Sequence, residues 1–128
     1  MTYKELSGAI IGAAIEVHRE LGPGLLESIY EHCLGKELRA LGLPFLQQHP
    51  VAVRYKGEPL DLGFRVDLWV DQRVIVEIKA VEGIHDVHLA QTLSYLKLTG
   101  SKLGLLLNFN EAVLRNGIHR IVNGLDEP

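Results

Sequence analysis

Two acidic residues and a lysine near the middle of the chain could together do chemistry: Asp67, Glu77 and Lys79. The acids lie in two apolar runs rich in β-branched residues, 65–70 and 74–80, which is typical of two strands joined by a tight turn. Carboxylate oxygens are ligands for hard divalent cations such as magnesium. A metal ion held by two acids beside a lysine can hydrolyse phosphodiester bonds.

The register of this hairpin follows from its apolar residues, because side chains alternate between the two faces of a strand. One buried face is expected to hold Val66, Leu68, Val70, Val74, Val76, Ile78 and Ala80. Only an odd-length loop keeps them together, so we predict a loop over 71–73. Asp67 then lies opposite Glu77, with Cβ atoms roughly 5 Å apart, where like charges destabilise a sheet. A cation, Mg²⁺ or Mn²⁺, would relieve this repulsion.

A simpler interpretation of the same residues is a solvated sheet face. Antiparallel sheets are often exposed on one side, and the charges of Arg65, Asp67, Arg73, Glu77 and Lys79 would then only contact water. The rest of the chain favours the metal site.

The elements that must position these residues can be predicted from periodicity. Helices are expected over 6–21, 25–41 and 86–99, because apolar residues recur there every three or four positions. The second helix would bury Leu26, Ile29, Cys33, Leu34, Leu38 and Leu41, and the third Leu89, Leu93 and Leu96. Strands are expected over 45–55, 60–70, 73–81, 103–109 and 118–122, with Pro50 marking an edge or a bulge. The order α-α-β-β-β-α-β-β predicts an α/β fold with a mixed β-sheet flanked by helices.

Composition limits the classes of protein that fit. A chain of 128 residues with 47% hydrophobic residues suits one domain, 1–128, with a real core. One cysteine, Cys33, excludes a disulfide framework within the chain and fits a cytoplasmic location. The longest weakly polar run is too short to span a bilayer. A net charge of −3 argues against strong non-specific binding of nucleic acid.

Several segments carry a resemblance that runs over nearly the whole chain. They are the stretches 14–18 and 21–24, Gly24-Leu25-Leu26-Glu27-Ser28-Ile29-Tyr30, Tyr55-Lys56-Gly57, Val76-Glu77-Ile78-Lys79-Ala80-Val81, and the stretches 91–100 and 104–109. In this order they resemble the GxxExxY family, small bacterial and archaeal proteins of the PD-(D/E)xK nuclease superfamily. The resemblance implies the nuclease fold and a metal-dependent nuclease acting on DNA or RNA.

The resemblance also implies roles for residues around the metal. Asp67 and Glu77 would bind it together with the backbone carbonyl of Ile78, and Lys79 would orient the attacking water. Glu27 matches the helix acid of RecB-like nucleases, which contacts the metal directly or through water. Its alternative role is a favourable interaction with the helix dipole. His18 is a further metal candidate by the same resemblance, although a lone histidine is more often structural.

Four residues are expected to contact the substrate. Gln91 and Tyr95 lie four residues apart on one helix face and resemble the Gln-x-x-x-Tyr motif of RecB-like exonucleases, which contacts the nucleic-acid strand. Tyr30 and Arg65 complete the expected set. A polar helix surface is the alternative for Gln91 and Tyr95.

Two other functions remain open at this point. The fold could serve a nucleic-acid-binding module that no longer cuts, or a protein-interaction adaptor. We also expect a homodimer, because the strand ending at Val122 would leave an open sheet edge that invites pairing.

Overall fold

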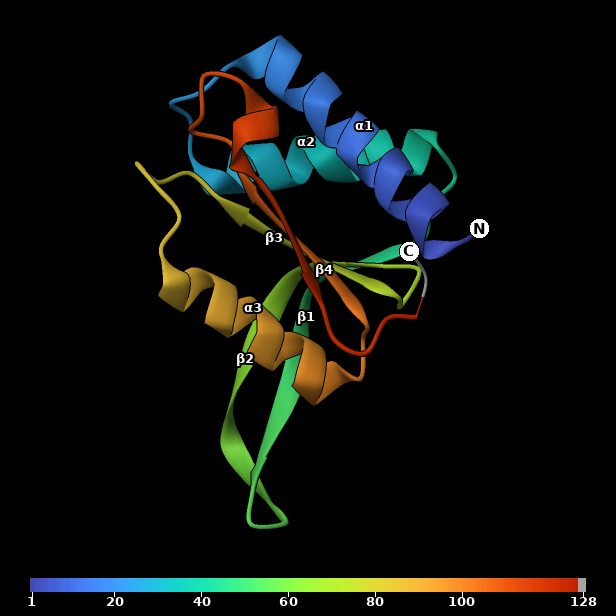
Figure 1. Ribbon diagram of the computed structural model, residues 1–128, viewed down its shortest axis with the longest axis vertical. Helices are drawn as coiled ribbons and strands as arrows, with labels where there is room; N and C mark the ends of the chain where they lie inside the picture. Colours follow the sequence, from blue (N-terminus) through green and yellow to red (C-terminus); the bar gives the residue numbers. More distant parts are fainter. Residues whose placement is uncertain (127–128) are drawn as a thin grey trace.

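The computed structural model describes residues 1–126 and confirms the predicted order of elements (Figure 1). Two helices come first, α1 (Tyr3–Leu21) and α2 (Glu27–Ala40). Three strands follow, β1 (Phe45–Tyr55), β2 (Glu58–Val70) and β3 (Val74–Lys79). Helix α3 (Asp86–Thr99), strand β4 (Leu103–Asn108), the 3₁₀ turn η1 (Leu114–Gly117) and strand β5 (Ile118–Val122) complete the chain.

The strands form one mixed sheet in the order β1-β2-β3-β4-β5. Strands β3 and β4 are parallel, and the other neighbouring pairs are antiparallel. Helix α3 is the crossover that two parallel strands require. Helices α1 and α2 cover one face of the sheet and α3 covers the other (Figure 1). The predicted α/β fold with a mixed, helix-flanked sheet is therefore confirmed.

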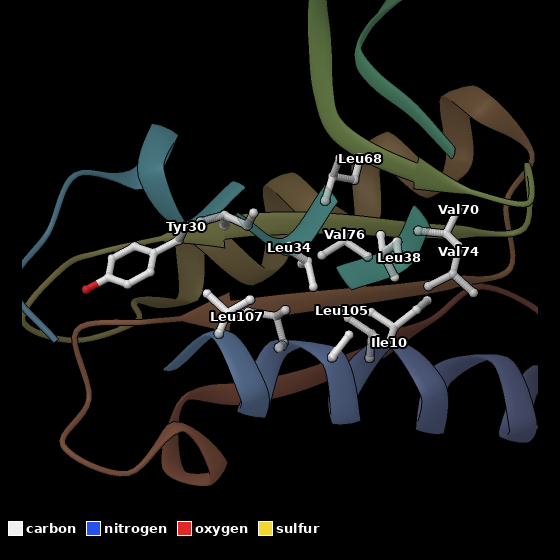
Figure 2. Close-up of a cluster of buried hydrophobic side chains, with 14 of the residues drawn as sticks. Ile10, Tyr30, Leu34, Leu38, Leu68, Val70, Val74, Val76, Leu105 and Leu107 are labelled. Atoms are coloured by element: carbon white, nitrogen blue, oxygen red, sulfur yellow. The ribbon is translucent and has the colours of Figure 1, made fainter. Parts of the chain in front are cut away.

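Two hydrophobic clusters hold these layers together. The larger one lies between the sheet and helices α1 and α2, and Figure 2 shows its centre: Ile10, Tyr30, Leu34, Leu38, Leu68, Val70, Val74, Val76, Leu105 and Leu107. The smaller one joins the sheet to α3 through Val51, Val66, Ile75 and Leu96. The central strands β3 and β4 are therefore buried on both faces.

The apolar faces of two helices differ from the prediction. On α2, Leu26, Ile29 and Leu41 are exposed, because the buried face is centred on Tyr30, Leu34 and Leu38. On α3, the buried residues are Thr92 and Leu96, whereas the predicted Leu89 and Leu93 are only half-buried. Both helices carry more apolar residues than one face can bury, so packing against the sheet decides which are covered.

The β2–β3 hairpin has the predicted loop and register. Asp71 and Gln72 adopt positive φ angles of 54° and 51°, and Arg73 N–H donates to the carbonyl of Val70 at 3.0 Å. Leu68 pairs with Val76, as expected.

Val66 lies on the face opposite the one predicted. It joins the α3-side cluster, whereas Leu68 faces α1 and α2. The cause lies in the neighbouring strand, where Gln48 has a φ of 49°. The β1–β2 ladder pairs Gln47 with Leu68 and His49 with Val66 but leaves Gln48 and Asp67 unpaired between them. The register is the same on both sides of this gap, so no residue is inserted, but the side chains of Val66 and Leu68 fall on opposite faces across it.

Within residues 1–126, no helix is both long and apolar enough to cross a membrane. The β1–β2 hairpin projects beyond the helices at one end of the molecule (Figure 1).

Candidate active site

The two predicted acids meet where the β2–β3 ladder stops. Its last backbone pair is Leu68 with Val76, and side chains take over beyond it. Ile78 N–H donates to Asp67 Oδ2 at 2.8 Å, and Asp67 N–H approaches Glu77 Oε2 at 3.4 Å. The carboxylates therefore replace strand pairing at this point and lie next to one another, as the sequence predicted.

Glu77 is the most perturbed group of the site. Its side chain is 5% exposed, and Oε1 has no hydrogen-bond partner among the described residues. Burial, followed by the nearby charge of Asp67, raises the pKa of Glu77 to about 9, while Lys79 opposes the shift weakly. Without a cation, the Glu77 carboxyl is therefore protonated at neutral pH. Its unpaired oxygen is a ligand position that a divalent cation would satisfy.

Lys79 is the last residue of β3, and hydrogen bonds anchor the backbone around it. Its carbonyl accepts a hydrogen bond from Phe109 N–H at 2.8 Å. The buried Asn108 side chain holds the backbone two residues further on, accepting from Val81 N–H at 3.1 Å and donating to the Val81 carbonyl at 3.0 Å. Asn108 and Phe109 therefore anchor the end of β3 that carries Glu77 and Lys79.

Glu27 contacts the same strand end from the other layer. It is the first residue of α2, and its Oε2 accepts a hydrogen bond from Ala80 N–H at 3.0 Å. An open cleft of about 700 Å³ lies here, lined by Leu25, Leu26, Glu27, Ser28, Glu31, Gln48, Asp67 and Ala80. The cleft therefore brings Glu27 and Asp67 to one surface.

Sequence reasoning missed a buried carboxylate in this cleft. Glu31 is 9% exposed, and each of its oxygens accepts a hydrogen bond at 2.7 Å, one from Gln47 and one from Gln48. The same Gln48 nitrogen also lies 3.0 Å from Asp67 Oδ1. Burial, and to a lesser degree the charge of Asp67, raises the pKa of Glu31. The available signal was its position one turn after Glu27, on the same face of the helix.

Tyr95 lies on α3, close enough to Glu77 and Asp67 for their charges to act on its hydroxyl. Its ring stacks on Phe64 with centroids 4.0 Å apart. Burial raises the pKa of Tyr95, and the charges of Glu77 and Asp67 raise it further, so the hydroxyl stays neutral and can donate a hydrogen bond. Gln91 lies one turn earlier, on the exposed surface of the helix.

Arg65 is also exposed and lies beside the acids. Its Nη1 donates to the carbonyl of Gln48 at 3.0 Å. Because Gln48 contacts Asp67, the guanidinium is placed close to the candidate site.

Two predicted site residues have structural roles instead. Tyr30 is fully buried and has no surface for a substrate. Its hydroxyl donates to the carbonyl of Gly22 at 2.6 Å and accepts from Leu25 N–H at 3.1 Å. His18 lies with Nε2 2.7 Å from the carbonyl of Glu111, which ties α1 to the segment after β4.

The donor set fits a cation that keeps part of its water shell. Among residues 1–126, no group of three or more His, Cys, Asp and Glu side chains is gathered closely enough to hold a metal. Magnesium, however, is usually bound by one or two carboxylates together with several waters. Asp67, Glu77 and the Ile78 carbonyl match that demand, and the unpaired Glu77 Oε1 favours it.

Comparison with known proteins identifies the class to which this fold and site belong. The sequence model of the PD-(D/E)XK nuclease superfamily matches residues 4–121. The chain therefore belongs to this superfamily, whose members typically use divalent metals and act on nucleic acid. No curated protein and no solved structure matches the chain.

Proposed function

We propose that this protein is a magnesium- or manganese-dependent nuclease that hydrolyses phosphodiester bonds of DNA or RNA. The observation that carries the proposal is the Glu77 carboxyl, which is buried beside Asp67 with one oxygen lacking a hydrogen-bond partner. A carboxyl that is buried without a partner for one oxygen lowers the stability of the fold. Acids whose pKa values are strongly shifted cluster at functional sites.

Each residue then has a defined task. Asp67, Glu77 and the Ile78 carbonyl would hold the cation, which lowers the pKa of a bound water and polarises the phosphate when it is present. Lys79 orients the attacking water and offsets charge that develops on the phosphate. Glu27, held against Ala80, steadies the cation or a water bound to it.

The substrate contacts come from the rim of the site. The neutral Tyr95 hydroxyl and the Gln91 amide donate hydrogen bonds to phosphate oxygens, and the exposed Arg65 adds a positive charge. Because these groups are few, binding of nucleic acid depends on contacts at the site. The net charge of −3 fits this, since it disfavours strong non-specific binding of nucleic acid.

We further assign the chain to the GxxExxY family within the superfamily. The motif's residues are joined in space, which supports this assignment. Tyr30 holds the backbone at Leu25, and Glu27 caps the end of β3 at Ala80. A cytoplasmic location is part of the proposal, and the single free cysteine, Cys33, is compatible with it.

A cleavage assay tests the proposal. Labelled single- and double-stranded DNA and RNA are incubated with the wild-type protein and Mn²⁺, alongside a binding titration in Ca²⁺. Asp67→Asn should abolish cleavage, and Asp61→Asn, which alters an exposed acid on the same strand, should not. Binding without cleavage of any substrate would replace the nuclease by a non-cleaving binding module. Neither binding nor cleavage would favour a protein-interaction adaptor.

A further inference from the structure

Gln48 is held in an unusual backbone conformation at the candidate site. Its φ of 49° lies in the left-handed region, which residues with a Cβ adopt at a cost. The β1–β2 ladder skips the Gln48–Asp67 position, although it pairs the residues on both sides. Strained, non-glycine backbone of this kind persists where the surrounding structure imposes it, often at functional sites.

The contacts of Gln48 explain what the conformation achieves. Its side-chain nitrogen lies 2.7 Å from Glu31 Oε1 and 3.0 Å from Asp67 Oδ1. An amide NH₂ group carries two hydrogens, so it can donate one to each carboxylate. At the other end of the residue, Arg65 holds the Gln48 carbonyl at 3.0 Å. The residue is therefore fixed through both its backbone and its side chain.

Asp67 is oriented from two sides as a result. Its Oδ2 is fixed by Ile78 N–H, and its Oδ1 is fixed by the Gln48 amide. Carboxylates that bind metals are commonly held by such outer hydrogen bonds, which keep the ligand in place before the metal arrives.

We propose that Gln48 is a positioning residue that sets the orientation of Asp67, using the buried Glu31 as its anchor on α2. This inference rests on the proposed function for its effect on metal binding, but not for its effect on Asp67 itself. The anchor accounts for an otherwise costly feature, a 9%-exposed carboxylate that is satisfied by two glutamine amides.

The neighbouring glutamine provides a matched control. Gln47 also donates to Glu31, at 2.7 Å, but the hydrogen bond to Asp67 comes from Gln48. Gln47→Ala therefore loosens Glu31 from one side and leaves the Asp67 contact intact. Gln48→Gly removes the amide and also relieves the left-handed backbone, since glycine adopts positive φ readily. This choice limits the risk that the variant fails to fold.

Two measurements on the wild type, Gln47→Ala and Gln48→Gly test the proposal. The first is amide hydrogen exchange of Ile78 without metal, because that N–H is bonded to Asp67. The second is Mn²⁺ affinity by calorimetry. Gln48→Gly should accelerate exchange at Ile78 about tenfold and weaken Mn²⁺ binding by about 10-fold or more, whereas Gln47→Ala should change each less than about threefold.

The two readouts separate the possible failures. Unchanged exchange at Ile78 in Gln48→Gly overturns the positioning role, whether or not metal binds. Equal effects of Gln47→Ala and Gln48→Gly also overturn it, because the loss of a hydrogen bond to Glu31, which both variants share, would then explain both effects. Faster exchange in a protein whose wild type binds no Mn²⁺ supports the positioning role and contradicts the proposed function.

Discussion

At the scale of single residues, the site is defined by Glu77, whose burial disfavours the charged form of its carboxyl. The folded-state pKa of Glu77 is raised from the ordinary value of 4.5 to about 9. The neutral form is therefore the one that the fold prefers. The Glu77 carboxyl therefore contributes its full stabilisation below pH 4.5, and this stabilisation is lost as the pH rises toward 9.

A glutamine at position 77 stays neutral at every pH, which gives a direct prediction. In the absence of metal, Glu77→Gln should be more stable than the wild type above pH 4.5, and the gain should grow up to about pH 9. At pH 8 we expect a gain of at least about 1 kcal/mol, or roughly 4 °C in Tm. Thermal unfolding in a chelator between pH 5 and 9 measures this, with exposed Glu82→Gln as the control. Parallel pH profiles for the two variants would falsify the assignment.

Lys79 and Gln91 should separate chemistry from binding. Lys79 follows Glu77 by two residues at the end of β3, whereas Gln91 lies on the exposed surface of α3. Lys79→Ala should lower kcat about 100-fold or more and leave affinity for nucleic acid nearly unchanged. Gln91→Ala should mainly weaken binding, with a smaller loss at saturation. Steady-state cleavage kinetics and a Ca²⁺ binding titration measure both effects, and a reversed pattern would exchange the two roles.

At the scale of elements, the site depends on how α2 begins. The Tyr30 hydroxyl closes the turn between α1 and α2 by bonding to Gly22 and Leu25, and its ring stacks on Phe109 with centroids 4.6 Å apart. Glu27 enters the cleft two residues after Leu25. The tyrosine therefore fixes the backbone just before Glu27 and in this way positions that acid.

Removing this hydroxyl should be costly. Tyr30→Phe keeps the stacking but removes two part-buried hydrogen bonds. At about 0.5–1.5 kcal/mol for each bond, the loss is about 1–3 kcal/mol. Tm should fall by roughly 4–12 °C, and turnover should fall because Glu27 is less well placed. Tyr55→Phe on the exposed hairpin is the control and should change neither. A Tyr30→Phe variant as stable as the wild type would show that the turn holds without the hydroxyl.

The sequence predicted these elements better than it predicted their faces. The odd-length loop and the alternation of apolar residues sufficed for the β2–β3 register, because both are local. The prediction for Val66 was wrong because the β1–β2 ladder breaks between Gln48 and Asp67, and no local pattern in β2 indicates that break. Leu26 was predicted to be buried but is exposed, because burial on α2 depends on how α1 and the sheet pack against that helix.

The candidate site was predictable to the same extent. Asp67 and Glu77 were found because their spacing in one hairpin brings them together. The contacts of Gln48 with Glu31 and Asp67 span 17 and 19 residues and follow no repeating pattern. Such contacts are decided by tertiary packing, so a single sequence does not reveal them.

At the scale of the whole molecule, the sheet has an open end that favours association. Strand β5 is the last in the order and pairs with β4 alone among the described strands, and Val122 is exposed. Exposed edge strands tend to pair with another chain. We therefore expect light scattering to report a homodimer across a range of protein concentrations. A monomer over that range would contradict the expectation.

The proposed chemistry depends on a divalent cation shared by Asp67 and Glu77. Anomalous diffraction from crystals soaked in Mn²⁺, measured at the manganese absorption edge, would locate this cation. We expect one anomalous peak between the two carboxylates, about 2.0–2.3 Å from an oxygen of each and from the Ile78 carbonyl. Crystals of Asp67→Asn should show no such peak. An empty site in wild-type crystals, or a peak that persists in the variant, would rule out the shared cation.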